Sequence, residues 1–130
     1  MKTALIVFLK SPEKGKVKTR IAQTEGEERA LSIYRLLLDK TYLLAEKMIA
    51  KNIVIFVFFS GNPNELKQWN KHQLYPQEGQ DLGERMKNAF KIVFEQGYDK
   101  VGIIGSDCYA LTEKHVRRGF EAIEKFDFVF

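Results

Sequence analysis

The chain has 130 residues, of which 45% are hydrophobic, enough for one domain with a buried core. Its single cysteine excludes an internal disulfide, its apolar runs are too short for a membrane span, and no signal-peptide cleavage site follows Met1, so we expect a cytoplasmic protein. The net charge is +4, and residues 1–20 alone hold six basic side chains and one acidic one. A nucleic-acid-binding protein usually spreads positive charge over a face. The concentration in one segment therefore favours a small anionic ligand over nucleic acid.

Apolar runs and helix signals alternate along the chain. Buried strands are predicted at residues 4–9, 53–59 and 101–104, with shorter strands at 73–76 and 126–130. Helices are predicted at residues 24–52, 62–71 and 81–97, and another after Thr112 with Val116, Phe120 and Ile123 on its core side. This order predicts an α/β three-layer sandwich with a mostly parallel sheet.

Several details of the helices are also predicted. Thr24 and Glu27 have the spacing of a capping box, and Asn62, Pro63 and Glu65 favour a helix start. The run Leu36–Leu38 is assigned to the core. A stripe on the third helix is expected to bury four side chains, Leu82, Met86, Phe90 and Val93.

A basic loop follows the first strand, between Lys10 and Arg20. Gly15 permits close approach of the backbone to an anion, and Lys18, Thr19 and Arg20 add an ammonium, a hydroxyl and a guanidinium suited to phosphate. The loop is not a Walker A motif, and one glycine does not make a dinucleotide fingerprint. On composition alone, a phosphate site and a solvated basic loop both remain open.

Two further segments follow predicted strands. Gln77, Gly79, Asp81, Gly83 and Arg85 form a segment that is able to line a nucleobase or ribose, although Asp81 and Glu84 also have the spacing of a helix cap, which we favour. Ser106 and Asp107 follow the strand 101–104, where a carboxylate is well placed for Mg²⁺ or Mn²⁺. From the residues alone we favour an Asx-turn or a helix cap for Asp107, because one Asp cannot hold a metal alone and Tyr109, not a second acid, follows two residues later. Ligands of parallel α/β sheets bind at the carboxyl ends of the strands, so we expect these segments and the basic loop at one edge.

Three motifs in this order carry a family resemblance. They are Phe8-x-Lys10-x-Pro12-x-x-Gly15-x-x-Lys18-Thr19-Arg20, Gln77-x-Gly79-x-Asp81-Leu82-Gly83-x-Arg85-Met86 and Ile104-Gly105-Ser106-Asp107-Cys108. With them the whole chain resembles the bacterial GT-A glycosyltransferase-like family of the nucleotide-diphospho-sugar transferase superfamily, of a type associated with arsenosugar biosynthesis. The resemblance implies the Rossmann-like nucleotide-binding half of a GT-A fold and a metal-dependent glycosyltransferase.

The resemblance also implies roles for these segments. Lys10 to Arg20 would hold the diphosphate of a nucleotide-sugar donor, Gln77 to Arg85, with Ser106, would line the nucleotide pocket, and Asp107 would be the catalytic, metal-binding aspartate. The family usually has Pro at the position of Tyr109, and it continues into a second half that would bind the acceptor. We therefore expect residues 1–130 to be a single domain, the N-terminal part of a longer protein, with an unknown acceptor.

Two alternatives remain open. A guanylyl- or cytidylyl-type nucleotidyltransferase has a similar fold and Thr-Arg pair, but its loop usually has a Pro-Lys soon after, which does not follow Arg20 here. The other alternative is a non-catalytic nucleotide-binding fragment. A chain that ends inside the apolar strand 126–130 leaves an unsatisfied edge or depends on a partner, and a homodimer would cover that edge.

Overall fold

Five parallel strands form one sheet at the centre of the molecule. The computed structural model describes residues 2–14, 16–105 and 128–129. The strands lie in the order β3-β2-β1-β4-β5, and every pairing between neighbours is parallel. Their bounds are Thr3–Lys10 (β1), Ile53–Ser60 (β2), Gln73–Pro76 (β3), Lys100–Gly105 (β4) and Phe128–Val129 (β5). The predicted strands are confirmed, the last one for residues 128–129 only, as is the α/β fold with a mostly parallel sheet.

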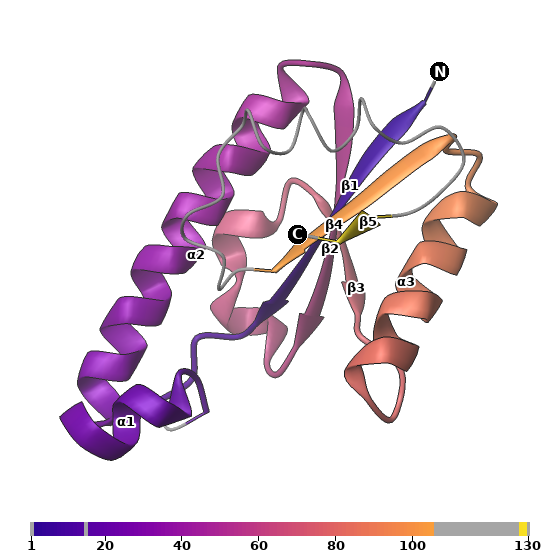
Figure 1. The fold of residues 1–130 in the computed structure, drawn as a ribbon. Helices are drawn as coiled ribbons and strands as arrows, with labels where there is room; N and C mark the ends of the chain where they lie inside the picture. Colours follow the sequence, from indigo (N-terminus) through magenta and orange to yellow (C-terminus); the bar gives the residue numbers. More distant parts are fainter. Residues whose placement is uncertain (1, 15, 106–127, 130) are drawn as a thin grey trace.

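Helices cover both faces of the sheet, as Figure 1 shows. The helices are α1 (Thr19–Glu25), α2 (Glu27–Ile49) and α3 (Leu82–Glu95). Side chains of β1 alternate between the two layers, because successive residues of a strand point to opposite faces. Leu5, Val7 and Leu9 pack in the cluster beneath α2, whereas Ala4, Ile6 and Phe8 pack in the cluster beneath α3. The continuous apolar run is thus explained by a strand buried on both faces.

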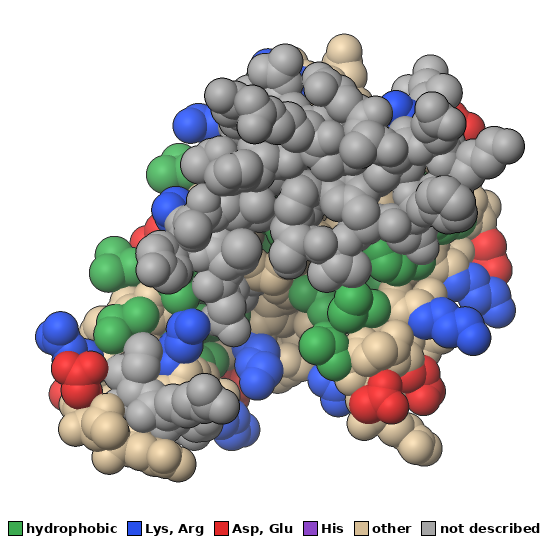
Figure 2. Space-filling view, viewed as in Figure 1, with side chains coloured by type: hydrophobic (Ala, Val, Ile, Leu, Met, Phe, Trp, Pro, Cys, Tyr) green, Lys and Arg blue, Asp and Glu red, His purple; other side chains and the backbone are tan. Residues whose placement is uncertain are grey.

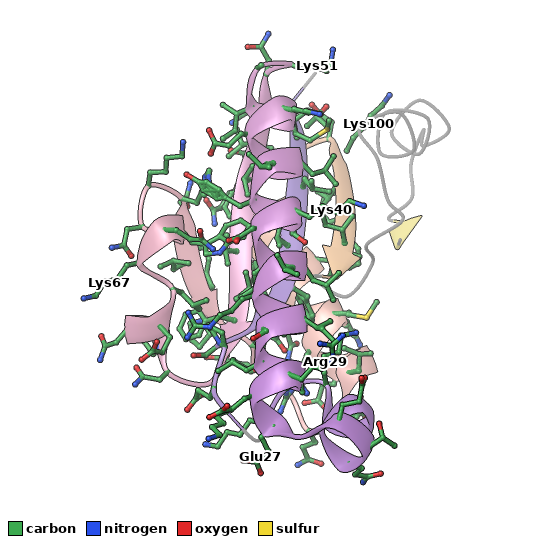
Figure 3. The ribbon with its side chains drawn as sticks, turned by 90° about the vertical axis from the view of Figure 1, so that its left-hand side faces the viewer. Glu27, Arg29, Lys40, Lys51, Lys67 and Lys100 are labelled. Carbon is green, nitrogen blue, oxygen red and sulfur yellow. The ribbon has the colours of Figure 1, made fainter. Side chains whose placement is uncertain are left out.

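The segment after β2 adds a second element to the α2 side. The single helix predicted for residues 62–71 is wrong in type, because the chain makes two 3₁₀ turns, Pro63–Glu65 and Lys67–Trp69. The predicted start is confirmed, since the Asn62 side chain accepts a hydrogen bond from Asn64 N. Leu66 and Trp69 are buried as predicted. In Figure 3 these turns lie beside α2, with Lys67 pointing outward.

Three predictions about the helices are wrong. Thr24 lies inside α1, and Gly26, at φ +93°, separates α1 from α2, so no capping box begins at Thr24. Leu36 is 69% exposed, because three successive helical residues cover most of a turn and cannot all face the sheet. Leu82 is 64% exposed at the first position of α3, ahead of the buried stripe.

The predicted end of α2 is nearly correct. The helix stops at Ile49, and Asn52 follows in the left-handed region at φ +65°, where its N–H donates to the carbonyl of Ile49. No helix in the described ranges is both long and apolar enough to cross a bilayer.

Candidate functional site

A cavity of about 280 Å³ opens at the carboxyl ends of the strands. Its lining comes from the ends of β1 and β4, from α2, from the residue after β3 and from the first turn of α3: Phe8, Leu9, Lys10, Tyr34, Gln77, Leu82 and Gly105. Gly105, the last residue of β4, pairs with Phe8. Figure 2 shows apolar side chains gathered on this face below the grey region, with Lys and Arg side chains nearby. Lys10, Gln77 and Gly105 come together at this edge, and the predicted approach of Ser106 and Asp107 to the basic loop lies outside the described residues.

The first turn of the basic loop is tied to the end of β2. Ser11 N donates to Ser60 O at 2.8 Å, and Glu13 Oε2 accepts from Asn62 N at 3.3 Å. Gly61, at φ +92°, makes this approach possible, because a Cβ there would lie 2.5 Å from Glu13 Oε2 and 2.9 Å from Ser11 Cβ. Hydrogen bonds to the end of β2 therefore fix the backbone at the start of the loop.

The cations of the basic loop differ in what they contact. Lys14 Nζ lies 3.3 Å from Glu28 Oε1, and Lys16 Nζ lies 3.6 Å from Glu13 Oε1. Lys10 is exposed and borders the cavity. Lys18 precedes α1 in the left-handed region at φ 48°. Gly15 and the side chains of Thr19 and Arg20 lie outside the described part of the structure, so their predicted phosphate contacts stay predictions.

Gln77 joins three strand ends. Its Nε2 donates to Leu9 O at 3.2 Å and to Phe58 O at 2.9 Å, and its backbone N donates to Phe59 O at 2.8 Å. Both amide hydrogens are thus directed at main-chain carbonyls. Gln77 lines the cavity and at the same time holds β1 and β2 together where they end.

The segment that follows Gln77 is shaped by contacts to its own backbone. Arg85 Nε donates to Gly79 O at 3.0 Å, and Asn88 Nδ2 donates to Glu78 O at 2.8 Å. Gly79 has φ +144°, and a Cβ there would lie 2.8 Å from Arg85 N. A glycine is therefore required at position 79. Gly83 is not constrained in this way, since a Cβ there would meet only Asp81 Oδ1, at 3.5 Å.

Asp81 is a helix cap in this structure. Its Oδ1 accepts from Glu84 N at 2.8 Å, which satisfies one of the free N–H groups at the start of α3. The cap favoured from spacing is confirmed, and contact of Asp81 with ribose stays a prediction.

The predicted metal site lies beyond the described residues. Ser106 and Asp107 directly follow Gly105 in the sequence, and neither they nor the helix expected after Thr112 are described. Within the ranges that are described, no three His, Cys, Asp or Glu side chains are grouped as a metal site would require. Asp107 therefore remains the one predicted ligand.

Of the residues that line the cavity, only Lys10 and Gln77 are predicted individually as site residues from the sequence, and the others are not: Phe8, Leu9, Tyr34, Leu82 and Gly105. Tyr34 lies within the helix predicted for residues 24–52 and is buried, at 2% exposure. The phenol itself was the signal available, because a buried tyrosine hydroxyl needs a hydrogen-bond partner. Leu82 was placed in the core, whereas it is an exposed apolar side chain at the mouth of the cavity.

The fold is a Rossmann-like α/β domain, and the cavity lies at the carboxyl edge of its sheet, where such folds bind their ligands. A family model described as "Uncharacterized protein conserved in bacteria (DUF2064)" matches residues 43–130. Because this match covers more than half of the chain, the protein belongs to that family. A search of curated proteins finds no match.

A solved structure shares this fold. It is a protein from Desulfovibrio desulfuricans G20 that carries the provisional name nucleotide-diphospho-sugar transferase, solved at 1.90 Å. It is 31% identical to this chain and superposes with a TM-score of 0.82. The match covers 93% of this chain and 54% of the solved chain, so this chain spans about half of its length.

Proposed function

We propose that this protein binds a nucleoside diphosphate sugar at the carboxyl edge of its sheet and acts as a glycosyltransferase of the nucleotide-diphospho-sugar transferase superfamily. The cavity lined by Lys10, Gln77 and Leu82 carries the proposal, because it combines an apolar wall with a cation where an α/β sheet binds ligands. The likeness to the provisionally named transferase supports it. The arsenosugar-associated type remains a prediction from the sequence.

The cavity and the loop have complementary parts in this proposal. Phe8, Leu9 and Leu82 offer apolar surface to the nucleobase or ribose, and Lys10 offers a positive charge to the diphosphate. Lys14 and Lys16 pair with exposed or partly exposed carboxylates. Such surface pairs contribute about 0–1 kcal/mol each, so a diphosphate can replace the carboxylate at little cost.

A divalent ion, Mg²⁺ or Mn²⁺, belongs to the proposal through Asp107. When bound, such an ion would offset the negative charge that builds up on the departing diphosphate. The described residues supply no ligand cluster for it, and Asp81 already uses Oδ1 to cap α3. The metal therefore rests on Asp107, and the contribution of the described residues is to bind and orient the donor.

A thermal-shift panel tests the proposal. Nucleoside diphosphates, their sugars, nucleoside triphosphates and nucleosides are added to the wild-type protein, each with and without Mn²⁺. A ligand at 100 times its Kd stabilises the fold by about 2.7 kcal/mol. We expect diphosphates and diphosphate sugars to raise Tm, with a further rise in Mn²⁺. An unchanged Tm with every compound would contradict the proposal.

Two variants test which residues bind the metal and the diphosphate. Asp107→Asn should lose the Mn²⁺-dependent rise and keep the metal-free one; a full Mn²⁺ response in this variant would remove Asp107 from the metal site. Lys10→Ala should weaken a diphosphate more than its nucleoside, and equal losses would contradict a role toward the diphosphate. Lys67→Ala is the matched control, because Lys67 is an exposed lysine on a 3₁₀ turn that borders a different cavity (Figure 3).

A further inference from the structure

Tyr34 makes two hydrogen bonds to one residue at the end of β1. Its hydroxyl accepts from Lys10 N at 2.7 Å and donates to Lys10 O at 2.8 Å. Tyr34 comes from α2, 24 residues further along the chain, and its side chain is buried. A helix side chain thus binds both main-chain polar groups of the last strand residue.

The two bonds lie two residues beyond the last β1–β4 pair in the described ranges. In a parallel ladder, successive residues direct their N–H and C=O groups to opposite neighbours. Ser11 N donates to Ser60 O in β2, so the N–H and C=O of Lys10 face the β4 side. Among the described residues, β1 and β4 pair as far as Phe8 with Gly105, two residues earlier. The Tyr34 hydroxyl therefore takes the place of a strand neighbour for Lys10.

The Tyr34 hydroxyl stands at the edge of the cavity. The N–H and C=O of Lys10 are part-buried where they meet this hydroxyl, and leaving such groups unpaired is costly. A single hydroxyl on α2 satisfies both groups. Tyr34, Lys10 and Gly105 all line the cavity, so the contact is made beside the space in which a ligand would bind.

We propose that Tyr34 is a positioning residue that fixes the backbone of Lys10, and with it the direction of the Lys10 ammonium, for binding the diphosphate of the ligand. This inference rests on the proposed function. Tyr34 acts through Lys10 and does not itself bind the diphosphate. Without the hydroxyl, the last residue of β1 is more mobile. Ligand binding must then order this residue, and the entropy cost of ordering it weakens the affinity.

A double-mutant cycle in Tyr34→Phe and Lys10→Met tests the inference. Dissociation constants of uridine and guanosine 5′-diphosphate, of the two nucleosides and of inorganic pyrophosphate are measured by calorimetry at a temperature where each variant is fully folded. Tyr34→Phe removes both bonds to Lys10, and it should weaken the diphosphates and pyrophosphate about tenfold and leave the nucleosides unchanged. In the Lys10→Met background the same change should have little effect, because the group that it positions is gone.

The outcomes separate the inference from the proposed function. No binding of any probe by the wild-type protein would overturn both. Binding by the wild type with Tyr34→Phe unaffected would overturn only the inference, as would equal losses from Tyr34→Phe in both Lys10 backgrounds, which indicate direct contact. Tyr75→Phe is the control, since the Tyr75 hydroxyl bonds Gln73 and Gln96 away from the cavity. It should bind every probe like the wild type.

Hydrogen exchange gives a second measurement that needs no ligand. The Lys10 amide should be protected in the wild-type protein and in Tyr75→Phe, and should exchange faster in Tyr34→Phe. If Tyr34→Phe does not fold, the wild-type amide still decides, because exchange at the rate of an unstructured peptide would show that the hydroxyl does not hold Lys10.

Discussion

Polar side chains are used in two different ways in this molecule. At the carboxyl edge of the sheet, Tyr34, Gln77, Asp81 and Arg85 bond main-chain atoms. Beside α2, near the start of β3, ionisable side chains lie close to one another. There Glu46 Oε2 lies 2.6 Å from Lys71 Nζ, and Glu46 Oε1 lies 3.5 Å from His72 Nε2.

These two kinds of contact have different roles in the molecule. Bonds to main-chain atoms fix the path of the loops, which is what a ligand site requires, and they are insensitive to pH between about 5 and 8 when neutral groups make them. Bonds between charged side chains hold α2 to the segment before β3 and vary with pH. Four substitutions, from the largest expected effect to the smallest, test this division.

Gly79→Ala should have the largest effect. The added Cβ would lie 2.8 Å from Arg85 N at a backbone φ of +144°, so the loop must shift or the strain must remain. We expect a loss of about 2 kcal/mol in the free energy of unfolding, measured by urea denaturation. Gly83→Ala is the control and should be neutral or slightly stabilising, since alanine suits a helix and space is available. Equal losses at positions 79 and 83 would contradict the assigned shape of the loop.

Asp81→Ala should cost about 1 kcal/mol, the usual value of a lost N-cap. Asp81→Asn retains an oxygen that can accept from Glu84 N, so its stability should stay close to that of the wild type. Urea denaturation measures both. If Asp81 only caps α3, Asp81→Asn should bind nucleoside diphosphates normally. A loss of ligand binding in this stable variant would instead assign Asp81 to the ribose.

His72 should make stability depend on pH. Burial lowers the pKa of His72 below its ordinary 6.5; Glu46 raises it by a smaller amount, and Lys71 lowers it further. The unfolded chain therefore takes up a proton before the folded one, and stability is lost as pH falls below 6.5. We expect the free energy of unfolding of the wild type to fall relative to that of His72→Gln as the pH is lowered from about 7.5 to 5.0.

Urea denaturation across this range measures the effect. The other histidine, His115, is present in both proteins and cancels. The pKa of Glu46 is lowered from 4.5, chiefly by the hydrogen bond from Lys71, so Glu46 stays ionised throughout the range. A wild-type advantage that grows toward low pH would show that the contact with Glu46 outweighs burial.

Glu28→Gln should have the smallest effect on stability. The pair with Lys14 is exposed, so its loss should change the free energy of unfolding by less than about 1 kcal/mol. The substitution leaves Lys14 without this carboxylate, and inorganic pyrophosphate should bind slightly more tightly if the basic loop receives phosphates. Calorimetry at low salt is the sensitive measurement. Weaker binding of pyrophosphate would count against the loop as the phosphate site.

Much of the fold follows from apolar periodicity. Strands such as β1 and β2 are continuous apolar runs, and their parallel pairing follows from the helices between them. The wrong burial predictions concern apolar residues that the sequence does not distinguish from buried apolar residues of the same helix. Leu36 to Leu38 are all leucine, so composition does not show which one faces the sheet, and Leu82 is as apolar as the buried residues of α3.

The site was predictable to a smaller extent. Lys10 and Gln77 were found because they follow strands, and the topology brings strand ends together. The role of Tyr34 depends on a contact between residues 24 positions apart, which no local pattern contains. The sequence likewise does not predict which side chains of Gln77–Arg85 bond the backbone, since a residue type does not reveal whether its hydrogen bonds go to the backbone or to a ligand.

Chemical-shift mapping tests the central claim most directly. A ¹⁵N-labelled sample is titrated with the nucleoside diphosphate that gives the largest thermal shift, with and without Mg²⁺. We predict that the largest amide shifts fall on Leu9, Lys10, Gln77, Leu82 and Gly105, around the cavity at the carboxyl edge. Shifts centred instead on the separate cavity between α2 and the 3₁₀ turns, lined by Arg35, Asn64 and Lys67, would contradict the account.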